Sequence, residues 1–147
     1  MSHSLTEIAL TLYGRNMIEF STSKTRVDVD QLKELFAEVG WGDKTKDEAR
    51  LRYMVENSTL VVTAWDRDRM VGFGRATTDR AFNGQINNVV VTSDYRGQGI
   101  GRQIVRTILQ EDPRVTYVLR ADPEHEEFYR ELGFDRAERA LVYRRRE

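Results

Sequence analysis

The sequence predicts a single α/β domain of the α+β type, in which helices pack against one mixed central β-sheet. The chain has 147 residues, which is enough for one domain with a complete core and too few for two. Its apolar residues change repeatedly between the spacing of strands and the spacing of helices. No internal repeat or linker interrupts this pattern, so all of the elements should share one core.

The expected elements follow the order β-α-α-β-β-β-α-β-α-β. In chain order they are strand 18–21, a helix from 28 or 30 to 39, helix 45–56, strands 59–65, 70–78 and 85–92, helix 100–109, strand 115–120, helix 122–133 and strand 140–144. Thr45–Glu48 resembles a capping box at the start of the second helix. The turn Asp66–Arg69 between two strands predicts a hairpin. Pro123, directly after Asp122, is typical of a helix start, and Gly133 is typical of a helix end.

Residues 1–16 precede the first clear strand and form an expected N-terminal extension, with the main domain over 17–147. Ser4-Leu5-Thr6-Glu7 resembles a capping box, and an apolar stripe at helical spacing follows from Leu5, Ile8, Leu12 and Tyr13. The extension is therefore expected to be either a short docked helix or a disordered leader.

The most informative stretch begins with the apolar strand Val89–Val91 and ends in a glycine-rich loop that leads into a helix. Gly97, Gly99 and Gly101 leave backbone N–H groups uncovered at the helix N-terminus, which predicts an anion site. A P-loop is excluded, because Arg and Gln follow Gly101 where Lys and Ser or Thr are needed. A dinucleotide fingerprint is excluded as well, because Arg102 occupies its sixth position.

What remains is Arg-x-x-Gly-x-Gly from Arg96 to Gly101, which resembles the acetyl-CoA pyrophosphate loop of the GNAT superfamily of N-acetyltransferases. The stretch Phe128-Tyr-Arg-Glu-Leu-Gly-Phe134 is similar to the end of that family's last helix. Both motifs stand in the family's order, and the element order matches the family over 17–145. A narrower resemblance, to small prokaryotic and plastid members that include plant-type serotonin N-acetyltransferases, rests on Phe73–Asp79, Phe82-Asn83, Val89–Val91 and Ala121–Pro123.

The resemblance implies acetyl-CoA as cosubstrate and a sheet that is splayed where the strand ends at Val91. Backbone groups at Val89 and Val91 would hold the pantetheine arm like an added strand. The N–H groups of 98–102 would bind the pyrophosphate. Arg96 and Arg102 either add charge-assisted contacts or are ordinary solvated side chains. The implied cofactor-binding residues are Val89, Val90, Val91, Arg96, Gly97, Gln98, Gly99, Ile100, Gly101 and Arg102.

The same resemblance makes Tyr129 the candidate general acid for the departing CoA thiolate. Phe128 and Leu132 form the core stripe, so Tyr129 is turned toward the edge of its helix; a packed tyrosine with a satisfied hydroxyl is the alternative. His125 lies one turn earlier on the same face and either assists Tyr129 or is solvated. Related enzymes often place an acidic residue just before the Val-Val-Val strand. Here that residue is Asn88, whose amide can only position water or the amine, so a water chain is expected to remove the proton.

Trp41, Phe82 and Asn83 are the expected contacts for the acceptor. An aromatic rim suits an arylalkylamine and also many other amines, and Trp41 alternatively only caps the core. The leading expectation is direct transfer of an acetyl group to a small primary amine, because the chain has no cysteine to carry it. The alternatives are acetylation of a protein lysine or N-terminus and an acyl-CoA-binding module with weak catalysis. A homodimer is also expected from the family.

The composition of the chain argues against several other kinds of site and partner. The absence of cysteine and the presence of only His3 and His125 make a metal site unexpected. A net charge of −1 gives no argument for a nucleic-acid or anionic membrane partner. No apolar run approaches the roughly 18 residues of a membrane span, and no signal-peptide core is visible. A cytoplasmic location is the default expectation.

Overall fold

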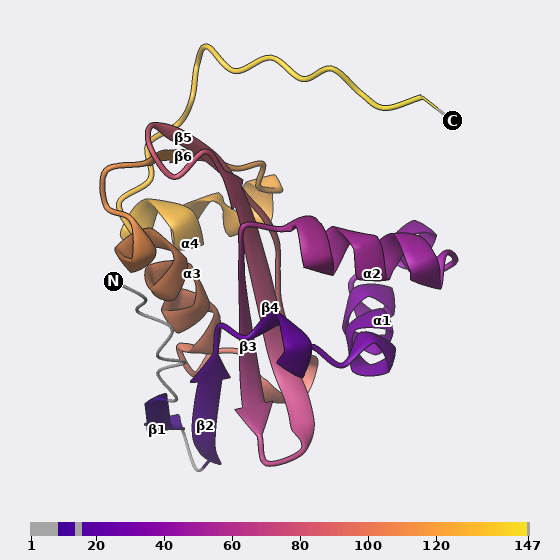
Figure 1. The fold of residues 1–147 in the computed structure, drawn as a ribbon. Helices are drawn as coiled ribbons and strands as arrows, with labels where there is room; N and C mark the ends of the chain where they lie inside the picture. The colour runs from indigo at the N-terminus through magenta and orange to yellow at the C-terminus, as the bar shows by residue number, and fades with distance from the viewer. Residues whose placement is uncertain (1–8, 14–15, 147) are drawn as a thin grey trace.

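A computed structural model describes residues 9–13 and 16–146, and Figure 1 shows their arrangement. Six strands form one sheet in the order β1-β2-β3-β4-β5-β6, antiparallel except for the parallel pair β5–β6. The strands are β1 Ala9–Tyr13, β2 Asn16–Ser21, β3 Leu60–Asp66, β4 Arg69–Thr78, β5 Asn83–Val91 and β6 Thr116–Val118. The helices are α1 Val29–Glu38, α2 Glu48–Asn57, α3 Ile100–Glu111 and α4 Glu126–Glu131, with 3-10 turns η1 Lys24–Arg26, η2 Gly42–Lys44, η3 Ser93–Tyr95 and η4 Pro123–His125. The predicted α+β class with a mixed sheet is confirmed.

Helices cover both faces of the sheet: α1 and α2 lie on one side, and α3 and α4 lie on the other (Figure 1). Each face has its own buried core. Ile100, Ile104 and Ile108 of α3 pack on one face, and Leu32 and Phe36 of α1 pack on the other. Because both faces are covered, β3 is buried along almost its whole length.

The first two helices begin where an aspartate caps them. Asp28 accepts a hydrogen bond from the N–H of Gln31, at 3.1 Å, and Asp47 accepts one from the N–H of Arg50, at 3.0 Å. The capping box expected at Thr45 is therefore wrong by two residues. The Thr45 hydroxyl donates instead to the carbonyl of Gly42, within a separate 3-10 turn.

The N-terminal expectation is corrected for residues 9–13, which form neither a helix nor a disordered leader. They form β1 and pair antiparallel with β2, from Ala9 opposite Phe20 to Tyr13 opposite Asn16. β2 has an open edge whose backbone groups pair with residues 9–13. This tertiary pairing outweighs the helical spacing of the apolar residues in the same segment. The capping box at 4–7 lies outside the described residues.

The last expected strand, 140–144, is also absent: no residue from 132 to 146 belongs to a helix or strand. The neighbouring strand β6 is shorter than predicted, and α4 begins at Glu126, after η4, rather than at Asp122. The helix ends as predicted near Gly133, whose φ of +99° is a left-handed conformation. A strand requires a partner, and within the described residues 140–144 pairs with no strand.

Two irregularities open the sheet around β5. Phe73 pairs with Val90 while Arg75 pairs with Asn87, so two residues of β5 face one of β4 in a β-bulge, with Asn88 at a φ of +55°. On the other side, β5 pairs with β6 only from Asn83 to Gln85. Beyond that point the two strands separate, and the predicted splay is present.

Candidate active site

A cavity of about 1180 Å³ occupies the split between β5 and β6. One wall is β5 from 86 to 91, and the opposite wall is the segment 119–122 that follows β6. The glycine loop, with 95–97 and 99–102, forms one end. Phe128 and Tyr129 of α4 line the interior, and Glu38, Val39 and Trp41 contribute from the opposite face of the sheet. Elements distant in the sequence therefore meet at one opening.

The glycine loop has the backbone that an anion site requires. Gly97 and Gly99 adopt left-handed φ values of +75° and +92°, and Gly99 is the N-cap of α3 with no side chain capping the helix. Within the described residues, the backbone N–H groups of 97–102 make no hydrogen bond. Gly101 differs, because a Cβ there would lie 3.5 Å from Phe128 Cζ, an ordinary contact distance, so the packing against α4 does not require a glycine. The loop thus offers a row of donors to a diphosphate.

Both candidate arginines of the loop already have partners. The Nε of Arg96 donates to the Val91 carbonyl at 2.8 Å, and its guanidinium lies 3.5 Å from a Glu38 carboxylate oxygen. Arg102 donates to Glu131 at 3.2 Å. Their side chains are about half exposed, so they can turn toward a phosphate by leaving exposed ion pairs of low stability.

Ile100 and Gln98 were both predicted to bind the cofactor, but their side chains do not face the cavity in the same way. Ile100 is buried in the α3 core, so only its backbone can reach a ligand at the cavity edge. Gln98 is outside the cavity lining. Its amide oxygen is buried and makes no hydrogen bond within the described residues. Its predicted role depends on its backbone N–H alone.

The strand Val89–Val91 serves the core and the cavity with different groups. The Val90 side chain is buried between the sheet and α1. Backbone pairing with β4 uses one edge of the strand, and no strand pairs with the other edge here, although the Val91 carbonyl accepts a hydrogen bond from Arg96. Free backbone donors and acceptors along such an edge suit an extended ligand with amide groups. Loop and strand together fit a cosubstrate with a diphosphate at one end and a pantetheine-like arm.

Tyr129 lies on the cavity wall, half-buried and held by two aromatic neighbours. Its ring meets Phe128 and Phe134 edge-on, with centroids 4.9 and 5.7 Å away. Burial raises the pKa of the Tyr129 phenol above its usual value near 10. The hydroxyl therefore keeps its proton at neutral pH and can donate it, or a hydrogen bond, to a group in the cavity.

Asn88 lines the cavity, but its amide oxygen is already engaged. It accepts a hydrogen bond from the Nε of Arg75 at 2.8 Å. Burial lowers the pKa of Arg75, although a guanidinium remains charged at neutral pH. Asn88 thus keeps its NH₂ group and the second lone pair of its oxygen to orient water or an amine.

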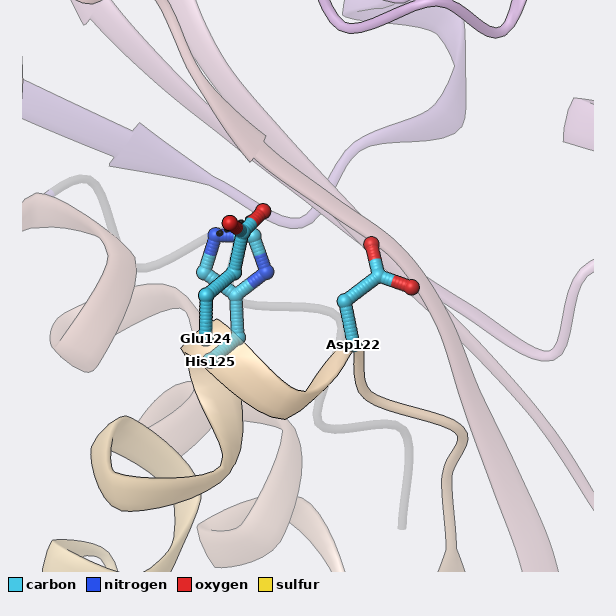
Figure 2. Close-up of side chains that lie close together, drawn as sticks. All are labelled: Asp122, Glu124 and His125. Atoms are coloured by element: carbon cyan, nitrogen blue, oxygen red, sulfur yellow. Dashed lines mark ion pairs between the residues drawn. The ribbon is translucent and has the colours of Figure 1, made fainter.

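Three polar side chains stand together beside Tyr129, on the cavity wall made by η4. Asp122, Glu124 and His125 each have one ligand-type atom within 4.8 Å of the others (Figure 2). All three are exposed, and His125 Nε2 lies 3.9 Å from a Glu124 oxygen. Asp122 and Glu124 were not predicted as site residues, and they give this wall a negative charge.

The predicted acceptor contacts divide into two groups. Trp41 lines the cavity, packed edge-on against Phe36 with centroids 5.3 Å apart. Phe82, in the turn between β4 and β5, and Asn83, the first residue of β5, lie outside the lining. The carboxylate of Asp79 accepts hydrogen bonds from the N–H groups of 81, 82 and 83 and folds this turn away from the cavity.

Glu38 is a further cavity residue that sequence reasoning missed. Burial alone would raise its pKa, but hydrogen bonds from the Ser93 N–H and the Thr92 hydroxyl, with the nearby Arg96, lower it overall. Glu38 is therefore ionised at neutral pH and fastens α1 to the end of β5. Its contacts lie 54 and 55 positions away in the chain, so no local spacing could have revealed them.

Comparison with known proteins identifies the family. The family model described as the acetyltransferase (GNAT) domain matches residues 27–144. The chain is a GNAT N-acetyltransferase. A soybean (Glycine max) protein named histone acetyltransferase TAP1 is 36% identical over 124 residues, covering 74% of this chain and 52% of the relative. Rice (Oryza sativa subsp. japonica) serotonin N-acetyltransferase 2, chloroplastic, is 36% identical over 122 residues, covering 76% and 58%.

Solved structures agree on the fold. A Staphylococcus aureus protein described as a probable acetyltransferase superposes with a TM-score of 0.76 at 23% identity, covering 88% of this chain and all of that one. The chain spans only about half the length of the soybean relative and 58% of the rice relative. Membership of this GNAT family implies acetyl-CoA as the cosubstrate, and the loop and strand edge above fit it. No helix in 9–13 or 16–146 is long and apolar enough to cross a membrane.

Proposed function

We propose that this GNAT enzyme acetylates a small primary amine that arrives as a cation. The observation that carries the proposal is the meeting of three features in one cavity: the unpartnered N–H groups of 97–102, the open edge of β5 and the Tyr129 phenol. The N–H groups suit the diphosphate of acetyl-CoA, and the β5 edge suits its pantetheine arm. Tyr129 supplies a proton donor in the same cavity.

Charge on the cavity wall supports a cationic acceptor. Glu38, Asp122 and Glu124 all line the cavity, and because Glu38 is paired with Arg96, Asp122 and Glu124 are the carboxylates that favour a cationic acceptor. Carboxylates lining a cleft raise the local concentration of a cation and orient it. Trp41 adds an aromatic surface, and the rice relative is named for serotonin, an arylalkylamine. An arylalkylamine is thus the first acceptor class to test.

The reaction requires that the amine lose a proton. An amine with a pKa near 10.4 is neutral in about one molecule in a few thousand at pH 7, which costs about 4–5 kcal/mol. Asn88 cannot accept that proton. Asp122, Glu124 and His125 stand on the same wall as Tyr129 and can receive it through water.

The remaining steps are divided among residues of the chain. Acetyl-CoA, when bound, supplies the acetyl group as a thioester. The N–H groups of 97–102 bind the diphosphate, and the β5 edge aligns the arm that leads to the thioester. As the C–N bond forms and the C–S bond breaks, the Tyr129 hydroxyl donates to the departing sulfur. A protein lysine is the second candidate acceptor, favoured by the name of the soybean relative.

The test is thiol release from acetyl-CoA against arylalkylamines, polyamines, amino acids and lysine peptides, with calorimetric binding of CoA in parallel. The variants Asp122→Asn and Glu124→Gln should raise KM for a cationic amine several-fold and leave the Kd of CoA unchanged. Glu34→Gln, an exposed α1 carboxylate outside the cavity, is the control. Turnover of lysine peptides alone would favour the second candidate. CoA binding without any turnover would contradict the proposal.

A further inference from the structure

Arg75 of β4 is a partly buried arginine whose charge no carboxylate of the described residues neutralises. Its Nε donates to the Asn88 oxygen at 2.8 Å, and its two terminal nitrogens make no hydrogen bond within 9–13 and 16–146. Burial lowers the pKa of Arg75, but the guanidinium stays charged at neutral pH. Because a buried charge costs free energy until it is paired, these unused N–H groups suit an anionic ligand.

The position of Arg75 in the sheet places it at the border of the cavity. Strand residues alternate between the two faces, so Arg75 shares its face with Phe73. Phe73 belongs to the core beneath α1, and so does Val61, which lies opposite Arg75 on β3. On β5 the residue opposite Arg75 is Asn87, which lines the cavity together with Asn88. The guanidinium therefore lies beside the cavity, on the side of the sheet that α1 and α2 cover (Figure 1).

The anion at Arg75 is not the diphosphate of acetyl-CoA. The glycine loop that suits the diphosphate leads into α3, and α3 packs on the other face of the sheet, where Ile104 and Ile108 are buried. Arg96 and Arg102 lie within that loop, and Arg75 is far from it in the sequence and on the opposite face. The acceptor is the second substrate of the reaction, so Arg75 is available to the acceptor.

A carboxylate fits the unused donors better than a phosphate does. The terminal nitrogens of a guanidinium form a planar fork that binds both oxygens of a carboxylate. One carboxylate also neutralises one guanidinium. A phosphate dianion would leave an extra negative charge beside a cavity that Asp122 and Glu124 already make negative.

We propose that Arg75 binds the carboxylate of the acceptor and that the acceptor is an α-amino acid. This rests on the proposed function, in which Asn88 helps to orient the amine. Asn88 is bonded to Arg75 and lines the cavity, so the places for the carboxylate and for the amine adjoin one side chain. The two groups must then be close together in the acceptor, as they are in an α-amino acid. Trp41 on the same cavity makes an aromatic amino acid the first to test.

Matched acceptors with and without the carboxylate test the proposal. Tryptophan is compared with tryptamine, and phenylalanine with phenethylamine, by thiol release from acetyl-CoA. For the wild type, kcat/KM should be about 10- to 100-fold higher for the amino acid of each pair. Equal values, or a higher value for the plain amine, would overturn the inference and leave the proposed function standing. If neither member of either pair turned over, the inference would fail, and the wider amine panel would show whether the proposed function fails with it.

Arg75→Gln separates carboxylate binding from a structural role of the guanidinium. It should lower kcat/KM about 10- to 100-fold for tryptophan and change the value for tryptamine by no more than about twofold. Arg75→Lys keeps the charge and should retain part of the preference for tryptophan. Arg50→Gln, at an exposed arginine of α2, is the control and should change neither value. An equal loss for both acceptors in Arg75→Gln would show that Arg75 only ties β4 to Asn88, and the inference would be wrong.

Discussion

Replacing Tyr129 by phenylalanine tests the chemistry assigned to the cavity. The ring contacts with Phe128 and Phe134 are retained, so the thermal midpoint and the Kd of CoA should not change. A thiol has a pKa near 8.5, and burial places the phenol above 10. Complete proton transfer is therefore uphill by at least about 2 kcal/mol. The hydroxyl contributes mainly a hydrogen bond to the developing thiolate.

A hydrogen bond to a charged group contributes about 1.5–3 kcal/mol, which corresponds to a loss of roughly 10- to 150-fold in kcat. The assay is thiol release under saturating acetyl-CoA with the best amine of the panel. Tyr53→Phe, an exposed tyrosine of α2, is the matched control and should match the wild type. A kcat for Tyr129→Phe within twofold of the wild type would refute the assignment, provided that CoA binding is intact.

Three further substitutions test the surrounding structure. Gly99→Ala should cost about 1–2 kcal/mol because of its left-handed φ and should raise the Kd of CoA by calorimetry, whereas Gly42→Ala, in open space, should not. Gly74→Ala would place a Cβ 2.5 Å from Ile104 Cγ2 and should lower the thermal midpoint by several degrees in calorimetric scans. Hydrogen bonds from backbone N–H groups lower the pKa of Asp79 in the folded state. The charged carboxylate therefore stabilises the folded protein above the usual carboxyl pKa near 4, and this stabilisation is lost as the pH falls through the lower pKa of the folded state. Asp79→Asn should therefore lower the urea midpoint at pH 7, and the difference from the wild type should shrink toward pH 2.

The fold was predictable from sequence wherever local chemistry decides it. The hairpin appears with its turn at Arg67 and Asp68, between β3 and β4. The glycine loop takes left-handed conformations at Gly97 and Gly99 because a side chain there would be strained. The two segments whose element type was predicted wrongly, 9–13 and 140–144, both lie near the ends of the chain, whereas the other errors concern where α2 and α4 begin and how long β6 is. Whether such a segment forms a strand depends on which backbone edge is available to it, and one sequence window does not contain that information.

The candidate site was predictable only along its contiguous parts. The loop, the strand Val89–Val91 and Tyr129 line one cavity, as the resemblance to the family implied. Phe82 does not, because the turn held by Asp79 directs it elsewhere. Glu38 reaches the site from the opposite face of the sheet. The partners of Glu38 are set by tertiary packing between α1 and the end of β5, and no sequence motif or periodicity predicts that packing.

Asn88 explains why an amide can stand where related enzymes often have an acidic residue. It sits at the bulge of β5 with a φ of +55°, a conformation that asparagine tolerates better than most residues. Its oxygen holds the Nε of Arg75 from β4, which ties the bulged strand to its remaining neighbour. The bulge bends β5 at the level where its pairing with β6 has already ended. Asn88 therefore helps to shape the cavity, and in the mechanism that we propose the amine's proton is removed by water and the charged wall made by Asp122, Glu124 and His125.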